Sequence, residues 1–346
     1  MPASRPATER PTDAATFIER RPRVTNALVA VAATLAFLLV AEATLWLAGF
    51  RFLLRPEDIE FGQPNPVVMK RVFEPDPDLL WVHRQYGDVL ATLRQESPDL
   101  LVLGDSCTHL GTYDDRLVER AAARGVDLAI GNLAVAGWSS FQGRRQVERD
   151  VADLGARVAT IYFGWNDHWV GFGIEDAQIA RLERFGQSAW GRLRLVQLAL
   201  KVRVVALARA AGWPRRVPLD DFADNLRQMT RRLEELGVRP MILTAPTSHR
   251  PGHVRESLEG RFVRDLDEVI PLHRSYADAA RQVAAEEDVP LCDLLARFDA
   301  LPVEERDRSF QRDGIHATPL GDQRIAAMLD RCFADAGYWP LLSAGR

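Results

Sequence analysis

The chain has 346 residues, a formal net charge of −4, and 47% hydrophobic and 27% charged residues. This is the composition of a folded protein, with room for one large domain or two ordinary ones. The chain has no basic excess and no dense basic stripe with interleaved aromatics, so it is not predicted to bind nucleic acid. Its three cysteines, Cys107, Cys292 and Cys332, exclude a disulfide-rich scaffold and show no zinc-binding spacing. A single Cys292–Cys332 bridge stays open for an oxidising compartment.

The N-terminus predicts a single membrane anchor. Residues 1–23 are rich in proline, threonine, alanine and arginine, which indicates a disordered cytoplasmic tail. Residues 24–50 are almost continuously apolar and long enough for a transmembrane helix. Glu42, the only charge inside this run, lies towards its far end, where a long side chain reaches the headgroups at reduced cost. Arginines before the run and Trp46 near its end place the bulk of the protein on the periplasmic side of the inner (cytoplasmic) membrane.

Other interpretations of the N-terminal segment are weaker. Ala41-Glu42-Ala43 has the small-x-small pattern of a signal-peptidase site, but the apolar run continues past it, which favours an uncleaved signal anchor. A buried globular helix is disfavoured because the run has no polar face at helical spacing. Residues 51–95, rich in proline and charge, then predict a juxtamembrane linker, and the segment 73–81 is expected to dock on the following domain as extended chain.

Residues 96–340 predict one α/β domain. Apolar runs of strand length alternate with helical stretches, which favours a parallel sheet covered on both faces. Right-handed crossovers then make a three-layer α/β/α domain with a five-stranded sheet, and ligands bind beyond the carboxyl ends of the strands. The expected strands are 100–104, 127–135, 158–164, 239–246 and 289–294, and the expected helices are 113–124, 142–155, 221–236, 274–287 and 319–335.

Residues 171–218 interrupt this alternation. They contain an apolar stretch studded with arginine, which is too short and too charged to span a bilayer. Three interpretations of this insertion stay open. It is a helix packed on the domain, a lid over the site, or an amphipathic helix at the membrane surface.

Four short polar blocks predict a catalytic site. They are Gly104-Asp105-Ser106 after the first strand, Gly137 after the second, Asn166 after the third, and Asp313 with His316 before the last helix. A serine hydroxyl is a weak nucleophile at neutral pH and needs an adjacent base. We expect His316 to be the base for Ser106, and Asp313 to orient the imidazole and stabilise its charged form. Thr318 and Pro319 fit the cap and first position of the last helix, which anchors that loop.

The same blocks supply donors for the oxyanion of an ester reaction. We expect the backbone N–H groups of Ser106 and Gly137 and the side-chain amide of Asn166 to form this oxyanion hole. Glycine at position 137 lets the backbone approach the substrate closely. Asp105 and Asp167 are expected to brace loops and to take no part in catalysis.

The remaining candidates are weaker. Trp165 and His249 are expected to line the substrate pocket, although Trp165 also fits a core position. Cys107 is expected to be a small buried side chain and not the nucleophile. His249 and His253 have helical spacing, but Pro251-Gly252 between them prevents a helix, so no metal pair is predicted.

The order Ser, Gly, Asn, His resembles the SGNH branch of the GDSL hydrolase family over roughly residues 96–337. This resemblance implies a flavodoxin-like α/β/α fold, no metal and no organic cofactor, and hydrolysis of carboxylic esters through an acyl-enzyme. Family members act on lipids, small esters and O-acetyl groups of polysaccharides, so the resemblance does not name the substrate. The anchor and residues 171–218 resemble membrane-tethered bacterial members. We therefore predict an esterase that acts on an acetylated glycan or a lipid at the cell envelope.

Two alternatives stay open. An O-acyltransferase would use the same triad with a glycan hydroxyl in place of water. Transferases of this type often partner a multi-span acyl donor, whereas this chain has one span, which mildly favours hydrolysis. A catalytically silent glycan-binding protein is the other alternative, and the intact set of catalytic residues argues against it.

Overall fold

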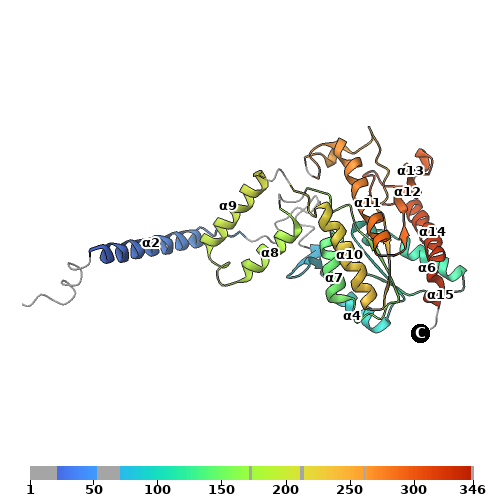
Figure 1. The fold of residues 1–346 in the computed structure, drawn as a ribbon, viewed down its shortest axis with the longest axis horizontal. Helices are drawn as coiled ribbons and strands as arrows, with labels where there is room; N and C mark the ends of the chain where they lie inside the picture. Colours follow the sequence, from blue (N-terminus) through green and yellow to red (C-terminus); the bar gives the residue numbers. More distant parts are fainter. Residues whose placement is uncertain (1–21, 53–70, 171–173, 211–213, 261, 344–346) are drawn as a thin grey trace, which may run out of the picture. The chain divides into compact units, whose positions relative to one another are not determined.

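A computed structural model of the protein describes residues 22–52, 71–170, 174–210, 214–260 and 262–343 (Figure 1). By its internal contacts the chain divides into two units. The first unit comprises residues 1–52 and 186–202, and the second comprises residues 53–185 and 203–346. The tail predicted over residues 1–23 lies outside the described residues except for its last two positions. Residues 53–70 of the predicted linker lie outside them as well.

The second unit is built on a five-stranded parallel sheet with the order β4–β3–β5–β6–β7. Its strands are β3 (Leu100–Gly104), β4 (Ile130–Asn132), β5 (Val158–Tyr162), β6 (Arg239–Leu243) and β7 (Leu291–Cys292). Leu100 in β3 pairs with Ile130 of β4 on one side and with Val158 of β5 on the other. The second strand of the sheet therefore lies on one side of the first, and the third, fourth and fifth strands follow in order on the other side. This is the flavodoxin-like order, and it confirms the predicted fold class.

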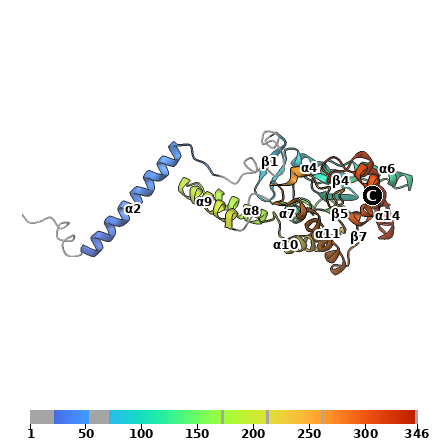
Figure 2. The same ribbon diagram turned by 90° about the horizontal axis from the view of Figure 1, so that it is seen from above.

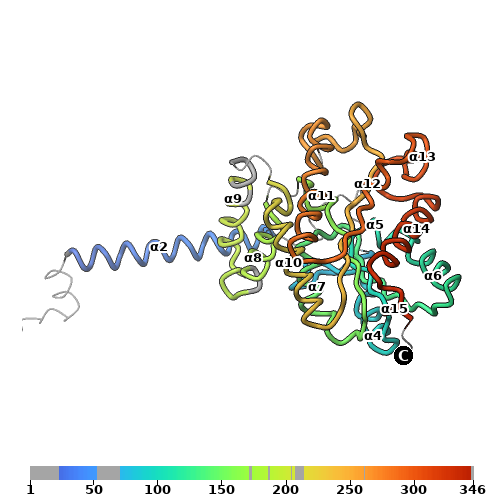
Figure 3. The backbone as a smooth tube through the Cα atoms, turned by 45° about the vertical axis from the view of Figure 1, so that its right-hand side comes forward, coloured from blue at the N-terminus to red at the C-terminus, as the bar shows by residue number. Residues whose placement is uncertain are grey.

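Helices cover both faces of the sheet, as Figures 1 and 3 show. One layer contains α7 (Ser140–Asp150), α10 (Leu219–Glu235) and α11 (Val269–Glu286), and the other contains α6 (Tyr113–Ala123), α14 (Pro319–Asp335) and α15 (Tyr338–Ser343). Figure 2 shows this unit from above. The spacing of apolar residues explains how α10 packs. The helix buries Phe222, Leu226, Met229 and Leu233, which recur every three or four residues and so lie along one face.

The predicted strand over residues 127–135 is shorter in the structure. Ile130–Asn132 forms β4, and beyond it the N–H groups of Leu133 and Val135 still donate to the carbonyl oxygens of Val102 and Gly104 in β3, both at 3.1 Å. The Asn132 side chain accepts the N–H of Ala134 at 3.0 Å. The remaining described helices are α4 (Tyr86–Glu96), α5 (Ser106–His109), α8 (Asp176–Gln187), α9 (Arg194–Ala210), α12 (Leu294–Asp299) and α13 (Val303–Ser309), with 3₁₀ turns at Glu256–Leu258 and Leu266–Glu268.

The second unit includes residues that were predicted to be linker. An antiparallel hairpin of β1 (Phe73–Asp76) and β2 (Leu80–His83) precedes α4. Trp81 in this hairpin is fully buried, and its carbonyl oxygen accepts the Trp138 indole N–H at 2.9 Å. The segment 73–81 therefore docks on the domain as expected, and the domain predicted to begin at residue 96 takes in the hairpin and α4.

The first unit contains one long apolar helix, α2 (Pro22–Leu47). Its stretch Arg23–Leu47 is long and apolar enough to cross a membrane. The carboxylate of Glu42 accepts the backbone N–H groups of Arg194 and Leu195 at 2.7 and 2.8 Å, at the start of α9. Part of the predicted insertion over residues 171–218 thus packs on the N-terminal helix.

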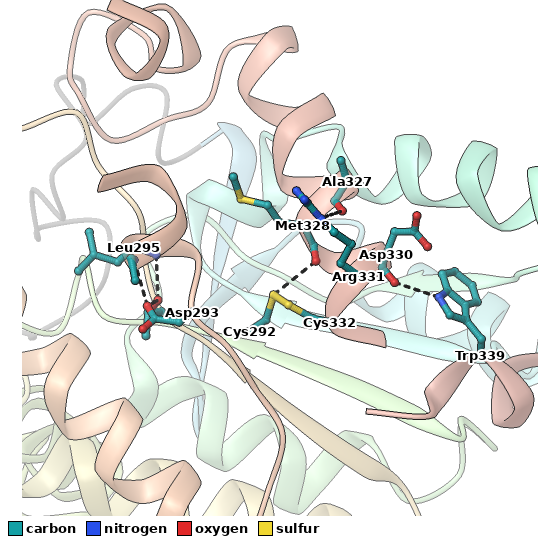
Figure 4. The surroundings of a disulfide bond; sticks show 11 residues. Cys292, Asp293, Leu295, Ala327, Met328, Asp330, Arg331, Cys332 and Trp339 are labelled. Carbon is teal, nitrogen blue, oxygen red and sulfur yellow. Dashed lines mark hydrogen bonds between the residues drawn. A yellow bond between two sulfur atoms is a disulfide. The ribbon is translucent and has the colours of Figure 1, made fainter. Parts of the chain in front are cut away.

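A disulfide joins Cys292 at the end of β7 to Cys332 in α14, with Cα atoms 5.6 Å apart (Figure 4). The bridge that the sequence left open is therefore present in the structure. It ties an edge strand to the helix layer across 40 residues of chain. Cys107 is a free thiol and is buried, as expected.

Candidate active site

Ser106 lies on a tight turn between the central strand β3 and the short helix α5. Asp105 caps α5, because its Oδ1 accepts the Cys107 N–H at 2.8 Å. A side chain at Gly104 would place Cβ 2.5 Å from the Thr108 hydroxyl, so only glycine fits there. The turn leaves the Ser106 hydroxyl partly exposed at the carboxyl edge of the sheet.

The structure brings Ser106, His316 and Asp313 together. His316 Nε2 lies 2.9 Å from Ser106 Oγ, and His316 Nδ1 lies 2.6 Å from Asp313 Oδ2. The other Asp313 oxygen accepts the backbone N–H groups of Ile315 and His316 at 2.9 and 3.0 Å. The loop therefore holds the carboxylate in one orientation, and the carboxylate holds the ring.

This hydrogen bonding sets the charge preference of the pair. Burial alone would lower the pKa of His316, but the hydrogen bond and charge of Asp313, with a contribution from Asp105, raise it above its ordinary value. Burial alone would raise the pKa of Asp313, but the His316 ring and two backbone N–H groups lower it. The arrangement stabilises an ionised carboxylate beside an imidazolium, which is the state that follows proton transfer from Ser106.

His249 supports this loop from behind, and its expected place in the substrate pocket stays a prediction. Its side chain is buried, and its Nε2 lies within hydrogen-bonding distance of the Asp313 carbonyl oxygen, at 2.8 Å. Gly314 has a φ of +74°, and a Cβ there would lie 2.5 Å from the same ring nitrogen. The glycine thus permits both the turn and the close approach of His249.

Asn166 follows β5 and is fixed to the serine turn. Its Nδ2 donates to Asp105 Oδ2 at 3.0 Å, so Asp105 holds the start of α5 with one oxygen and Asn166 with the other. Burial raises the pKa of Asp105, opposed by the hydrogen bonds from Cys107 and Asn166. Asp105 is a brace in this structure, as expected from the sequence. It orients one amide hydrogen of Asn166, and among the described residues the second amide hydrogen has no acceptor.

Gly137 adopts a φ of +82°, a backbone conformation that favours glycine. Its carbonyl oxygen accepts the Arg216 Nη1–H at 2.8 Å. Within the described part of the chain its N–H has no intramolecular acceptor. The peptide is therefore held by its carbonyl side, and its N–H is available for a substrate oxygen.

Sequence reasoning missed the buried ion pair that holds Gly137. Arg216 contacts Asp176 through two hydrogen bonds, at 3.1 and 2.8 Å, and both side chains are almost fully buried. Asp176 also accepts the Ser139 hydroxyl at 2.7 Å, two residues beyond Gly137. No sequence signal joins these charges, because they lie 40 positions apart at the two ends of the insertion.

Other candidates have structural roles. Asp167 accepts the N–H of Ser140 at 2.8 Å, and burial raises its pKa to about 7, so it braces the start of α7. Trp165 is 2% exposed and stacks on His273 with ring centroids 3.9 Å apart, so it packs in the core. It also borders a small cavity beside His249, and its role in the substrate pocket stays a prediction. The Cys107 thiol is buried, which raises its pKa, and it is not placed as a nucleophile. Among the described residues no group of three or more His, Cys, Asp or Glu side chains is arranged to hold a metal ion.

Comparison with known proteins identifies the family. Residues 102–324, more than half of the chain, match the model of the GDSL-like Lipase/Acylhydrolase family. The chain belongs to this family. It is therefore an esterase or acylhydrolase, and the matched region contains the serine turn, Gly137, Asn166 and the Asp313–His316 loop. No curated protein matches the chain.

Several solved structures are similar to this GDSL-like hydrolase. A lipase/acylhydrolase from Enterococcus faecalis has a TM-score of 0.46 and 17% identity, covering 68% of this chain and 95% of its own. A GDSL-like lipase from Bacteroides thetaiotaomicron has a TM-score of 0.46 and 13% identity, covering 72% and 98%. The acetylxylan esterase Axe2 from Geobacillus stearothermophilus has a TM-score of 0.43 and 17% identity, covering 68% and 93%.

Proposed function

We propose that this GDSL-like hydrolase cleaves carboxylic esters through an acyl-enzyme on Ser106, on the extracytoplasmic side of the cytoplasmic membrane. The observation that carries the proposal is the chain of two short contacts from Ser106 through His316 to Asp313, at 2.9 and 2.6 Å. Such a chain is what activates a serine hydroxyl as a nucleophile.

The reaction proceeds in two halves. Ser106 Oγ attacks the ester carbonyl carbon while His316 Nε2 takes the hydroxyl proton, and the carbonyl oxygen becomes an oxyanion. The intermediate collapses, the alcohol leaves with the proton from His316, and the acyl group stays on Ser106. A water molecule then gives its proton to His316 and attacks the acyl carbon, which releases the acid and restores Ser106.

Three donors stabilise the oxyanion in each half. The backbone N–H groups of Ser106 and Gly137 and the second amide hydrogen of Asn166 serve this role. Two braces support the assignment, since Asp105 holds the Asn166 amide at 3.0 Å and Arg216 holds the Gly137 carbonyl at 2.8 Å. Donors that are fixed before the reaction need no reorganisation when charge develops.

The surroundings of Ser106 favour esters with a short acyl group. The sequence neighbours of the three donors, Cys107, Ala136 and Trp165, are at most 5% exposed. Asp313 and His316 are 39% and 24% exposed, so the triad opens to solvent. Packed side chains at the donors and an open catalytic loop suit a small acyl group on a bulky alcohol, such as an O-acetyl group of an envelope glycan, better than a long lipid chain.

Two features support the extracytoplasmic location. The protein contains a Cys292–Cys332 disulfide, and disulfides form and persist mainly in oxidising compartments. Arg20, Arg21 and Arg23 precede the apolar helix, which favours an N-terminus on the cytoplasmic side.

Labelling with a fluorophosphonate probe tests the nucleophile. The full chain in detergent should become labelled at Ser106, and the Ser106→Ala variant, shown to be folded by circular dichroism, should not. A folded wild-type protein that stays unlabelled would defeat the acyl-enzyme proposal.

Product analysis separates hydrolysis from transfer and tests the acyl preference. The protein is incubated with p-nitrophenyl esters of two to sixteen carbons and with an acetylated oligosaccharide plus an unacetylated acceptor. We expect free acetate as the main product and falling kcat/KM with chain length. Strong transfer to the acceptor with little acetate would instead identify an O-acyltransferase, and a preference for the longest ester would identify a lipid substrate.

The compartment is tested with alkylating reagents on intact cells. A cysteine introduced at an exposed position of the catalytic unit, such as Ala122→Cys, should react with a membrane-impermeant maleimide after the outer barrier is opened. Reaction only after lysis of the cytoplasmic membrane would contradict the proposed orientation.

A further inference from the structure

The first unit joins α2 to a segment far away in sequence, Gly186–Val202. We propose that this segment, called here the interface segment, lies on an anionic phospholipid surface at the extracytoplasmic end of α2. The proposal rests on the membrane anchor of the proposed function and extends it to a second lipid contact.

Glu42 fixes the level of the interface segment relative to α2. Twenty helical residues from Arg23 to Glu42 extend about 30 Å, which is the thickness of the hydrocarbon core. The Glu42 carboxylate therefore lies at the far boundary of that core, and it accepts the N–H groups of Arg194 and Leu195 at 2.7 and 2.8 Å. The first turn of α9 is thus held at the depth where headgroups begin.

The Glu42 contact also explains why a charge is tolerated in the apolar helix. An isolated carboxylate at this depth is costly unless it has a partner. The free N–H groups at a helix start are a favourable partner, because they carry the positive end of the helix dipole. From the sequence, Glu42 was predicted to reach the headgroups, whereas in the structure its carboxylate accepts two backbone N–H groups.

Further contacts hold the interface segment on the end of the anchor. The Gln197 side chain is buried, accepts the N–H of Phe52 at 3.1 Å and donates to the Gly191 carbonyl at 3.0 Å. The Lys201 ammonium lies 5.7 Å from the Phe50 ring centroid. The segment and residues 42–52 therefore form one small folded body.

The exposed side chains of this body match a membrane interface. Trp190 is 70% exposed and Val202 is 61% exposed, and Trp46 and Leu47 on the anchor are 66% and 81% exposed. Tryptophan beside apolar side chains is typical of the headgroup level of a bilayer. In water these side chains would remain an unpaired apolar surface.

Charge identifies the lipid class. The whole chain has more acidic than basic residues, 48 against 44, yet no aspartate or glutamate occurs between Arg184 and Leu219. Arg192 and Lys201 in the interface segment are both exposed. A basic segment with exposed tryptophan and apolar side chains binds surfaces of anionic phospholipid more strongly than neutral ones.

Depth-dependent quenching in vesicles tests the inference with the full chain. A cysteine placed at Ala189 carries an environment-sensitive fluorophore, and the lipids carry nitroxide groups. Cys107 is buried and the other two cysteines are bonded, so the added thiol is the one labelled. Leu39→Cys in α2 is the positive control for insertion, and Ala122→Cys on α6 is the control for the catalytic unit.

We expect quenching at positions 39 and 189 but not at 122, in vesicles containing phosphatidylglycerol. Quenching at 39 without quenching at 189 would overturn the interface segment and leave the anchor intact. Absence of quenching at 39 would overturn the anchor of the proposed function, and the interface segment with it.

Charge variants test the lipid class. Arg192→Gln with Lys201→Gln should weaken association of position 189 with anionic vesicles by roughly fivefold per charge, with a smaller effect at high salt. The matched pair Arg94→Gln with Arg331→Gln, on exposed positions of α4 and α14, should leave quenching at 189 unchanged. Equal effects of both pairs, or equal quenching on neutral vesicles, would contradict an anionic surface.

Discussion

The two units of this chain use apolar side chains in opposite ways. In α14 of the catalytic unit Leu329 and Phe333 are fully buried, whereas in α2 of the first unit Phe37 and Leu39 are 71% and 70% exposed. The catalytic unit encloses its core and places a few polar atoms with high accuracy at its edge. As the proposed anchor, the first unit would depend on composition and length, because a bilayer accepts any sufficiently apolar face. Single substitutions at the site should therefore lower the activity strongly in the catalytic unit, whereas single substitutions in the first unit should change the activity little.

The largest effect is expected for Ser106→Ala, which removes the attacking oxygen. Hydrolysis of a soluble ester such as p-nitrophenyl acetate should fall by roughly 10⁵- to 10⁶-fold, measured as kcat. Cys107→Ala is the control, because it removes the adjacent buried thiol and should retain most of the activity. Comparable losses in both variants would show that the turn itself, and not the hydroxyl, had been damaged.

Asp313→Asn should come next, with kcat lower by about 10³- to 10⁴-fold because the ring loses its orienting charge. The wild-type His316 pKa is raised, so kcat/KM should fall as the pH drops through a value above the ordinary 6.5. The variant keeps the burial but loses the carboxylate, so this acid limb should move to lower pH.

The pH–rate profile checks this prediction. Asp307→Asn, on an exposed carboxylate paired with Arg250, should leave both kcat and the profile unchanged. An unmoved acid limb in Asp313→Asn would separate Asp313 from the titrating base.

Asn166→Ala should lower kcat by about 10²- to 10³-fold with little change in KM, since an oxyanion donor acts mainly in the transition state. Steady-state kinetics on the same soluble ester measures the split. A kcat equal to that of the wild type would remove Asn166 from the oxyanion hole.

Arg216→Lys should lower kcat by roughly ten- to a hundredfold. One ammonium group cannot reproduce the guanidinium contacts to Asp176 and the Gly137 carbonyl together, so the loop shifts. The control is Arg215→Lys, on the neighbouring arginine that pairs with Glu268 at the surface. If both variants keep full activity with normal melting temperatures, the Arg216–Asp176 pair does not position Gly137.

Removing residues 1–50 should have the smallest effect on chemistry. The triad and its braces all belong to the second unit, so kcat/KM for a soluble ester should be unchanged. The truncated protein is compared with the full chain in the same detergent. Loss of activity on the soluble ester would mean that the first unit acts on the site as well as tethering it.

The convergence of the proposed catalytic residues was predictable, because the polar blocks follow the ends of neighbouring strands. β3 and β5 are continuously apolar runs whose carboxyl ends adjoin in a parallel sheet, so the polar residues after them meet at one edge. The Asp313–His316 spacing of three residues places both side chains on one loop. The resemblance to the family added a second argument, because the serine, glycine, asparagine and histidine blocks occur in the family's order along the chain.

The supporting residues were not predictable in the same way. His249 and Trp165 carry groups that suit a pocket, and only packing shows that one supports the Asp313 loop and the other fills the core. Asp176 and Arg216 meet across 40 positions, and a charge pair of that separation has no local signal.

The amino-acid sequence by itself determined the alternation of strands and helices, the apolar helix, and the choice of the proposed catalytic groups. These depend on periodicity and residue chemistry, which are local properties. Tertiary structure alone decided which buried charges hold Gly137, which cysteines are bonded, and what the Glu42 carboxylate contacts. Those contacts join distant parts of the chain, and their energy exists only after the fold has brought the partners together and removed them from water.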